Sequence, residues 1–421
     1  MDKALILQNK HWQNQKYKEL NKRKILSKII KKLELKEIEI ITGVRRSGKS
    51  ALLKLIINEL IDTGINPNSI LLVNIEDPNF LYEPEKDKLL YKLIELSEKI
   101  TSIKPEYIFF DEIQFLKGWE LQVKSLYENG DFKKIFVTGS NSKLLDTSYA
   151  NLLSGRYTIN KIYPYDFREI LEFKGIKNMK ALISNSATVK RVVDEILLYG
   201  SFPEIFKHKD YDLKKELLLS YYDTIIYKDC ISYFNIRETE NFKRLIDYFI
   251  RNIGTLYSYN SLARQIESNE NTVKEYIRVL EENFLLNEIK FYSDSFKKQM
   301  RENKKSYIID NSFLTLTYIK NSEDKGRLFE NLVFTEFMKR GYELYYFKEI
   351  NEIDFIVKRK DDTFAVQVSY ELNKNNMERE LKGLKTLMKK INLEKGMIIT
   401  YDQENQIDNI EISPFYKYFF N

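Results

Sequence analysis

The sequence predicts an α/β fold in which a parallel five-stranded sheet lies between helices, followed by further helices and a second, smaller α/β domain. Three observations lead to this prediction. Apolar runs alternate with amphipathic segments through roughly the first 160 residues, as in a layered sheet with crossover helices. A glycine-bounded loop joins the first apolar run to a long helical pattern. Near the end of the chain, an acidic β segment and a second β segment are followed by another helix and strand.

The loop after the first predicted strand has the spacing of a phosphate-binding site. An apolar run ends at Gly43, and Gly48, Lys49 and Ser50 open the helix, which completes a G-x-x-x-x-G-K-S pattern. Glycines let the backbone curl so that N–H groups point inward, and the helix N-terminus adds positive potential there. Lys49 would reach the β- and γ-phosphates, and Ser50 would hold Mg²⁺. The predicted nucleotide-binding residues are Gly43, Val44, Arg45, Arg46, Ser47, Gly48, Lys49 and Ser50.

A later apolar strand ends in two acids, Asp111 and Glu112. In an open parallel sheet, ligands bind at the carboxyl ends of the strands. Asp111 is therefore expected to hold Mg²⁺, and Glu112 to act as general base on the attacking water. The separate glutamate and the absence of a guanine-reading Asn-Lys-x-Asp motif favour ATP over GTP.

Polar side chains also follow the next predicted strand. Ser140 and Asn141 are candidates to orient the water and contact the γ-phosphate, although a helix N-cap explains Ser142 better and also fits Ser140. A helix is expected over 144–153, before a fifth strand. Arg156 opens that strand near the rim of the site, where it would act as a finger on the γ-phosphate of a neighbouring subunit, or else has no nucleotide role.

Composition excludes several classes of protein. The chain is 43% hydrophobic and 31% charged, which indicates globular domains. It has neither a signal-peptide pattern nor an apolar stretch long enough to span a membrane. Cys230 is the single cysteine, which rules out an intrachain disulfide and predicts a cytoplasmic protein. The two histidines, His11 and His208, lie too far apart in sequence to suggest a zinc site.

The net charge of +6 only mildly favours an anionic partner. Residues 1–32 are more basic, with ten Lys or Arg against two acids. One interpretation is the solvated face of an amphipathic helix, and the other is a contact with nucleic acid.

The middle of the chain changes character. Residues 163–235 are mostly helical and predict a small lid. Residues 240–318 contain three helical patterns followed by two β segments, which is typical of a winged helix. Glu281 and Glu282 in the third helix favour packing against protein over tight DNA binding. If DNA binds, the candidate contacts are Arg264, Lys274 and Arg278.

The last quarter of the chain places Glu330 early in a helix, Asp354 in a strand and Gln367 in the next strand. The order of helix, acidic strand, second strand, helix and strand resembles the PD-(D/E)XK nuclease fold. The resemblance implies that Glu330, Asp354 and Gln367 hold a divalent metal beside DNA.

Cleavage by that fold needs a lysine two residues after Gln367, where this chain has Ser369. A replacement, Lys348 or Lys358, would have to approach from elsewhere. We therefore expect a nuclease-like scaffold that has lost cleavage and still binds nucleic acid or a protein.

Four motifs together resemble a prokaryotic AAA-type ATPase family whose phosphate loop reads G-x-R-R-x-G-K-[ST] and whose ATPase domain precedes an uncharacterised domain. The resemblance covers nearly the whole chain and implies an AAA-like core, with Asn141 as a sensor and Arg156 as an arginine finger. The family's Gly-Gly-aromatic-Pro turn appears here with a serine, as Gly200-Ser201-Phe202-Pro203. The four motifs are residues 43–50, 109–114, 137–142 and 153–156.

We accordingly expect a magnesium-dependent protein that binds and hydrolyses ATP and couples turnover to movement of its C-terminal domains, with DNA, a protein client or a second copy as partner. One alternative is a nucleotide-dependent switch or tether that binds a protein. Another is an ATP-regulated nuclease acting through Glu330, Asp354 and Gln367. The expected parts are an N-terminal helix with the ATPase domain (1–175), a helical lid (176–238), a winged helix (239–320) and a nuclease-like domain (321–421).

Overall fold

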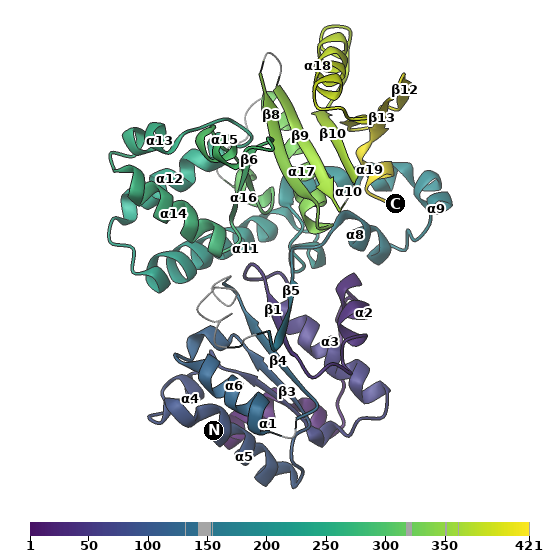
Figure 1. The fold of residues 1–421 in the computed structure, drawn as a ribbon. Helices are drawn as coiled ribbons and strands as arrows, with labels where there is room; N and C mark the ends of the chain where they lie inside the picture. The colour runs from purple at the N-terminus through teal and green to yellow at the C-terminus, as the bar shows by residue number, and fades with distance from the viewer. Residues whose placement is uncertain are drawn as a thin grey trace. The chain divides into compact units, whose positions relative to one another are not determined.

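The chain forms two compact units, residues 1–162 and 163–421 (Figure 1). The computed structural model describes residues 1–130, 132–141, 153, 155–316, 322–349, 352–360 and 362–420. The helix predicted over 144–153 therefore lies almost entirely outside the described residues, as does Ser142. Every helix in the described part of the chain is too short or too polar to cross a bilayer.

The first unit is built on a five-stranded sheet in the order β2-β3-β4-β1-β5, and every neighbouring pair is parallel. This confirms the predicted fold. The strands are β1 (Ile38–Thr42), β2 (Ile70–Asn74), β3 (Tyr107–Asp111), β4 (Lys134–Gly139) and β5 (Tyr157–Lys161). The described helices are α1 (Asp2–Gln8), η1 (Lys10–Gln13), α2 (Lys24–Ile30), α3 (Lys49–Asp62), η2 (Pro67–Ser69), α4 (Pro78–Leu81), η3 (Lys86–Lys88), α5 (Leu89–Thr101), η4 (Ile113–Phe115) and α6 (Trp119–Asn129).

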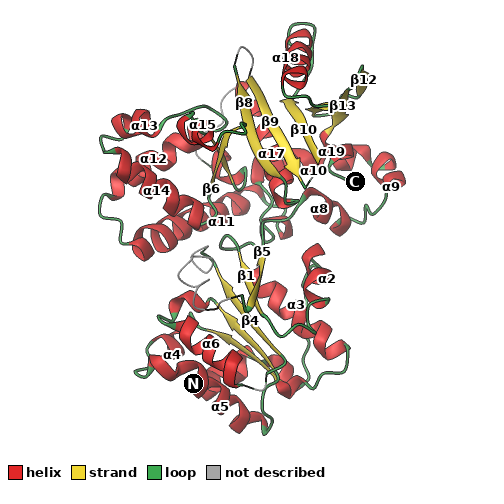
Figure 2. Cartoon of the chain, viewed as in Figure 1, coloured by secondary structure: helices red, strands yellow, loops and turns green. Residues whose placement is uncertain are grey.

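Helices cover both faces of this sheet (Figure 2). Ile40 and Phe110 pack with α1, α5 and α6 on one face, whereas Ile41 and Phe109 pack with α2 and α3 on the other. Successive side chains of a strand point to opposite faces, so a strand buried on both faces needs an unbroken apolar run. This is why the apolar runs of the sequence locate the strands.

The basic N-terminal segment packs back onto the same unit. Lys16 pairs with Asp62, and Lys22 Nζ lies 3.1 Å from Glu59 Oε1, both acids of α3. Arg23 Nη1 donates to the Ser47 carbonyl at 2.8 Å. These contacts support the structural interpretation of the basic segment over a nucleic-acid contact.

The second unit contains a mixed eight-stranded sheet in the order β12-β13-β11-β10-β9-β8-β6-β7. β6 and β7 form an antiparallel hairpin, and β6 then pairs in parallel with β8, so the hairpin extends the C-terminal sheet (Figure 2). The strands are β6 (Leu286–Phe291), β7 (Lys305–Ile308), β8 (Glu343–Lys348), β9 (Glu352–Arg359), β10 (Asp362–Ser369), β11 (Gly396–Thr400), β12 (Asn405–Ile407) and β13 (Ile410–Pro414).

Helices of the second unit precede and surround this sheet. The segment η7 has π-helical hydrogen bonding and continues directly from α11. The described helices are α8 (Phe167–Phe173), α9 (Met179–Ser184), α10 (Ser186–Tyr199), η6 (Ile205–Lys207), α11 (Tyr211–Asp223), η7 (Thr224–Ser232), α12 (Thr239–Arg251), α13 (Tyr259–Gln265), α14 (Glu270–Glu282), α15 (Phe296–Arg301), α16 (Ser312–Thr315), α17 (Ser322–Lys339), α18 (Met377–Lys390) and α19 (Phe415–Tyr418).

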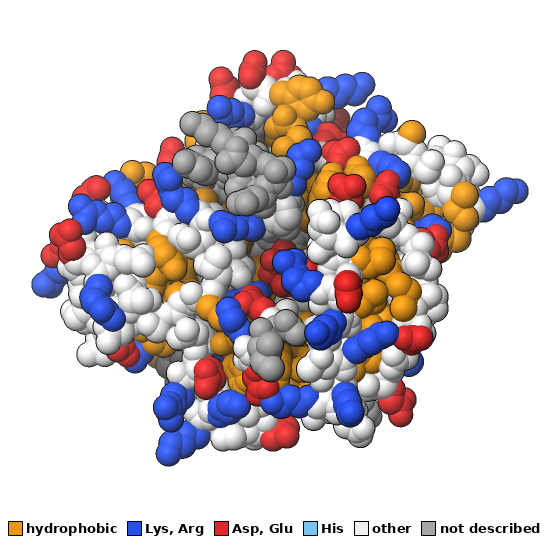
Figure 3. All heavy atoms as spheres, turned by 90° about the horizontal axis from the view of Figure 1, so that it is seen from above, with side chains coloured by type: hydrophobic (Ala, Val, Ile, Leu, Met, Phe, Trp, Pro, Cys, Tyr) orange, Lys and Arg blue, Asp and Glu red, His pale blue; other side chains and the backbone are white. Residues whose placement is uncertain are grey.

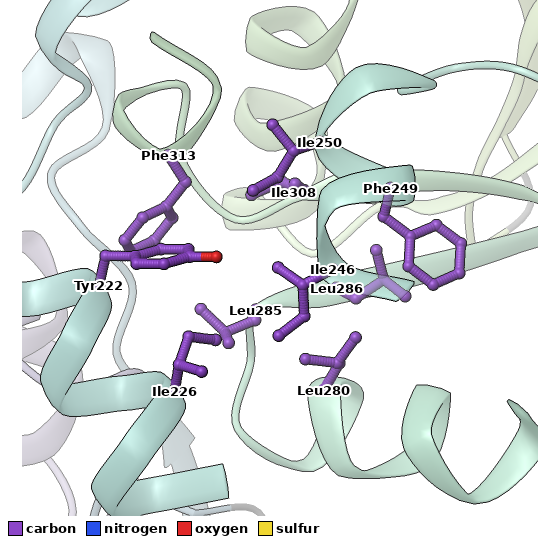
Figure 4. Close-up of a pocket in the computed structure, with 10 residues that line it drawn as sticks. All are labelled: Tyr222, Ile226, Ile246, Phe249, Ile250, Leu280, Leu285, Leu286, Ile308 and Phe313. Atoms are coloured by element: carbon purple, nitrogen blue, oxygen red, sulfur yellow. The ribbon is translucent and has the colours of Figure 1, made fainter. Parts of the chain in front are cut away.

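Apolar side chains from α11, η7, α12, α14, β6, β7 and α16 converge around a small cavity of about 20 Å³ (Figure 4). Such a volume is barely that of one water molecule. The predicted lid and the helices that follow it therefore share one core rather than enclosing a ligand pocket there.

The serine in the Gly200-Ser201 turn has a structural role. Gly200 has φ 69°, and a Cβ on it would lie 1.5 Å from Asp310 Oδ1. Ser201 donates to Asp310 Oδ2 from its backbone N at 2.7 Å and from its hydroxyl at 2.9 Å. The departure from the family pattern thus supplies an extra hydrogen bond to the buried Asp310.

Candidate functional site

The phosphate-loop sequence joins β1 to α3 in a tight curl. A Cβ on Gly43 would lie 1.9 Å from the Ile162 carbonyl oxygen, so only glycine fits. Gly48 directly precedes α3 with φ 99°, a conformation that glycine adopts without strain. Arg46 also has a positive φ, 69°, which costs a non-glycine residue about 1 kcal/mol.

Lys49, at the first position of α3, points into this loop. Its side chain is 3% exposed, and Nζ donates to the carbonyls of Gly43 at 3.0 Å and Val44 at 3.3 Å. Glu112 Oε1 lies 3.8 Å from the same nitrogen. An ammonium held by loop carbonyls can turn to phosphate oxygens without leaving the loop.

Asp111 ends β3 beside the start of α3. It accepts hydrogen bonds from the hydroxyls of Ser50 and of Thr138, which lies on the adjacent strand β4. Thr138 Oγ1 also accepts from the Glu112 backbone N at 3.0 Å. Burial, and then the negative charge of Glu112, raise the pKa of Asp111. Thr138 therefore fixes both acids, a role that the sequence did not suggest.

Glu112 follows in a left-handed conformation, with φ 53°. Gln114 Nε2 donates to Glu112 Oε2 at 2.6 Å and to Ser140 Oγ at 3.1 Å. Burial by itself would raise the pKa of Glu112, but the positive charges of Lys49 and Arg45 outweigh it, and the pKa is lowered. The carboxylate is thus ionised and held in place, as a general base requires.

Two buried polar groups around the phosphate loop are able to bind a ligand. Ser47 Oγ and Gln114 Oε1 are buried and have no hydrogen-bond partner among the described residues. The oxygens of Ser50 and Asp111 are hard donors of the kind that Mg²⁺ prefers. The residues present therefore fit a nucleoside triphosphate with Mg²⁺.

Ser140 and Asn141 lie at this same edge of the sheet, and both are buried. Thr42 Oγ1 donates to the Asn141 carbonyl at 3.2 Å, so Asn141 is placed beside the end of β1. The structure thus brings both predicted sensor residues to the loop, with Ser140 in the Gln114 network.

Arg156 lies elsewhere. Its carbonyl accepts from the backbone N of Ile38 at the start of β1, and its Nη2 lies 3.0 Å from Glu128 Oε1. A strand rises about 3.3 Å per residue, so the five residues of β1 separate Arg156 from the phosphate loop. The expectation that Arg156 lies at the rim of its own chain's site is wrong, while a role towards a neighbouring chain stays a prediction.

The second predicted cluster also assembles, with a lysine in it. Gln367 Oε1 accepts from the backbone N of Asp354 at 3.3 Å, and Lys305 Nζ lies 3.8 Å from Asp354 Oδ1 and 3.5 Å from Glu330 Oε1. Glu352 Oε1 is closer still, at 2.7 Å from the same nitrogen. Within the described ranges, His, Cys, Asp and Glu form no group of three or more that could hold a metal.

Sequence reasoning missed Lys305 because it lies in β7, outside the region with the nuclease-like order. Lys348 Nζ instead lies 2.9 Å from Glu352 Oε2 with a half-exposed side chain, and Lys358 is exposed. Lys305 can be recognised as part of the cluster only from its distances to the carboxylates in the structure.

Two of the three candidate DNA contacts are paired within their own helix. Lys274 Nζ lies 2.6 Å from Glu270 Oε1, and Arg278 Nη1 lies 3.6 Å from Glu282 Oε1. On the face drawn in Figure 3, Lys and Arg side chains are interspersed with Asp and Glu side chains. Neither feature favours binding dominated by phosphate contacts.

Family models match three successive segments: an AAA domain at 35–171, a domain of unknown function (DUF8612) at 190–324, and another (DUF4143) at 325–418. The first contains the phosphate loop, Asp111 and Glu112, and the candidate residues Ser140 and Asn141. The chain is therefore a nucleotide-binding protein of the AAA-type P-loop ATPase class.

Two relatives span almost the whole chain. An uncharacterized protein of Haemophilus influenzae is 32% identical over 403 residues, covering 93% of this chain and 96% of that protein. The uncharacterized protein MJ1544 of Methanocaldococcus jannaschii is 33% identical over 427 residues, covering 94% of this chain and 91% of that protein. The chain belongs to the family of these two proteins.

Solved structures show a looser likeness. Aeropyrum pernix ORC1 in complex with DNA matches with a TM-score of 0.34 and 11% identity, over 69% of this chain and 89% of that one. AMPPCP-bound DnaA from Aquifex aeolicus matches with a TM-score of 0.25 and 16% identity, over 64% of this chain and 91% of that one. The family assignment rests on the sequence relatives.

Proposed function

We propose that this protein hydrolyses ATP in a magnesium-dependent reaction, with Glu112 as the general base. One observation carries the proposal: Glu112 is buried and ionised, 3.8 Å from Lys49, with its other oxygen held by Gln114. A carboxylate with a fixed position and an available lone pair can take a proton from a water beside the γ-phosphate.

The other residues of the site divide the work of binding. Lys49 exchanges its two loop carbonyls for β- and γ-phosphate oxygens, and the loop amides bind the remaining phosphate charge. Ser50 and Asp111 would hold Mg²⁺, which neutralises charge on the phosphates when bound. Ser140 and Asn141 orient the water, and Arg156 acts in a neighbouring copy of the chain.

We further propose that turnover moves the second unit. A winged-helix assignment for 239–320 is supported by three helices followed by the antiparallel β6–β7 hairpin. A nuclease-like assignment for 321–421 is supported by the succession of α17, β9, β10, α18 and β11. The remaining proposed parts are a lid at 176–238 and an ATPase domain at 1–175, of which residues 163–175 lie in the second compact unit.

Glu112→Gln tests this proposal against a nucleotide-dependent switch. The substitution keeps the size and the hydrogen-bonding shape of the side chain but removes its basicity, so we expect unchanged ATP affinity and a loss of phosphate release of about 100-fold or more. Glu120→Gln, in the first turn of α6, is the matched control and should hydrolyse ATP normally. Normal phosphate release by Glu112→Gln would contradict the proposal.

The partner is tested by one further assay. Phosphate release is measured with no addition, with single-stranded DNA and with double-stranded DNA. Stimulation by DNA that is lost in Arg264→Ala would support a DNA client. Equal rates in all three conditions would favour a protein client, in agreement with the paired cations of α14.

A further inference from the structure

The charge cluster of the second unit is built from two regions that are distant in sequence. β7 contributes Lys305 and Tyr307, α17 contributes Glu330, and β9 contributes Glu352 and Asp354. Residues two apart in a strand share a face, so the two side chains of β7 and the two acids of β9 each point to one side of the sheet. The same side is covered by α17, which packs on β7, β8 and β10.

Lys305 fills the point where the carboxylates converge. Its side chain is 1% exposed, and its Nζ lies 2.7, 3.5 and 3.8 Å from oxygens of Glu352, Glu330 and Asp354, respectively. Tyr307 donates its hydroxyl to Glu330 Oε1 at 2.5 Å. An ammonium has three donors, and here it faces three carboxylates.

A divalent metal does not fit this arrangement. It would need oxygens at about 2.0 to 2.6 Å, which is closer than the ammonium allows. The metal would also have to displace Lys305 or sit beside its positive charge. The two acids of the predicted nuclease-like centre, Glu330 and Asp354, therefore already face a cation of the chain itself.

We propose that Lys305 takes the place of the divalent cation in the Glu330–Glu352–Asp354 cluster, so that this site is a metal-independent clamp between the β6–β7 hairpin and the C-terminal sheet. The clamp adds to the backbone pairing of β6 with β8. The proposal rests on nothing at the nucleotide site, so its failure would leave the ATPase proposal untouched.

The first test measures Mn²⁺ binding to the nucleotide-free full-length protein by electron paramagnetic resonance. Wild type and Asp354→Asn should bind the same small amount of Mn²⁺. Binding by wild type that is lost in Asp354→Asn would overturn the proposal. So would Mn²⁺-dependent cleavage of plasmid DNA by wild type that is lost in the same variant. Because the Mn²⁺-binding measurement uses the wild-type protein, it tests the proposal even if a variant of Lys305 fails to fold.

The second test empties the position of the cation. Lys305→Ala leaves the carboxylates facing a space that adjoins a cavity of about 210 Å³, which Asp354 and Glu352 help to line. The matched control is Lys304→Ala, because Lys304 Nζ donates instead to the carbonyls of Gln299, Met300 and Glu302.

Mn²⁺ should raise the melting temperature of Lys305→Ala by about 3 °C and leave wild type and Lys304→Ala unchanged. No response of Lys305→Ala to Mn²⁺, or an equal response of all three proteins, would overturn the proposal.

Discussion

The two units each bury a lysine beside carboxylates, yet they use it differently. Lys49 is held by two loop carbonyls, and Glu112 Oε1, a carboxylate oxygen of the described part of the chain, lies 3.8 Å from it. Lys305 is surrounded by three carboxylates, the nearest at 2.7 Å. In the first site the lysine can change partners, and in the second it cannot without leaving several negative charges buried. Direct hydrogen bonds to loop carbonyls thus mark the lysine of the proposed ligand site, whereas close contact with carboxylates marks the lysine of the proposed clamp.

The backbone shows the same contrast. The nucleotide site contains two non-glycine residues with positive φ, Arg46 and Glu112. Each of these backbone conformations costs about 1 kcal/mol of folding free energy. Lys305 instead lies in β7, which pairs regularly with β6, and neither Lys305 nor Asp354 has a positive φ, although β9 shifts its register against β8 next to Asp354. Positive φ at non-glycine residues, held by the surrounding structure, is typical of sites that bind or react.

The largest effect is expected on the stability of the second unit. Lys305→Met removes the charge but keeps most of the volume, and so leaves Glu330 and Asp354 without this lysine, while Glu352 keeps its pairing with Lys348. We expect the free energy of unfolding to fall by about 3 kcal/mol. Urea unfolding of the full-length protein followed by circular dichroism would measure this.

Lys297→Met is the control for that measurement, since Lys297 is an exposed residue of α15. A loss in Lys305→Met no greater than in this control would show that the two buried lysines do not differ as described.

The response to pH should distinguish the units further. His11, in the first unit, is buried and its Nε2 donates to the Ile70 carbonyl at 3.0 Å; burial lowers its pKa to about 4. The unfolded chain takes up this proton near pH 6.5, so the stabilising contribution is complete above that pH and is lost as the pH falls towards 4. We expect a loss of about 2 kcal/mol at pH 5.

Tryptophan fluorescence reports this change in the first unit alone, because both tryptophans, Trp12 and Trp119, belong to it. Urea unfolding at pH 7.5 and pH 5 would be compared for wild type and His11→Gln. The glutamine keeps a donor for Ile70 but does not titrate in this range. An equal pH dependence of the two proteins would contradict the assignment.

The smallest effect concerns Gln114, which positions the base of the first site. Gln114→Ala removes the hydrogen bond to Glu112 Oε2, and we expect kcat for ATP hydrolysis to fall about tenfold with KM unchanged. Gln122→Ala is the matched control, because Gln122 is a buried glutamine of α6 that accepts from the backbone N of Leu90 at 3.1 Å. Equal losses of kcat in both variants would mean that Gln114 acts only on stability.

The residues of the proposed nucleotide site could be singled out from the sequence because they are close together in it. Gly43, Gly48 and Lys49 follow one another in a spacing with a known physical cause, and Asp111 directly ends an apolar strand. Strands β1 to β4 are buried along almost their whole length, so mainly apolar runs indicated them, whereas the edge strand β5 is mostly exposed or half-buried. The fold of the first unit followed from these features.

Contacts between distant segments could not be predicted in this way. Lys305 lies in a strand whose sequence resembles any other buried β segment, and it reaches Glu330 and Asp354 only in the fold, where β7 packs against α17 and β6 pairs with β8. β8 is not among the predicted strands, although Leu344, Tyr345, Tyr346 and Phe347 form a short apolar run in it. Thr138 was read as part of an apolar strand, although its hydroxyl fixes Asp111.

The central claim, that the loop around Lys49 binds the phosphates of ATP, is tested most directly by nucleotide titration of Lys49→Ala. Lys54→Ala is the matched control, since Lys54 lies on the same helix with its Nζ 5.6 Å from the Tyr17 ring centre. We expect wild type and Lys54→Ala to bind ATP alike and Lys49→Ala to bind about 100-fold more weakly. Unchanged affinity in Lys49→Ala, or no saturable binding by wild type, would contradict the claim.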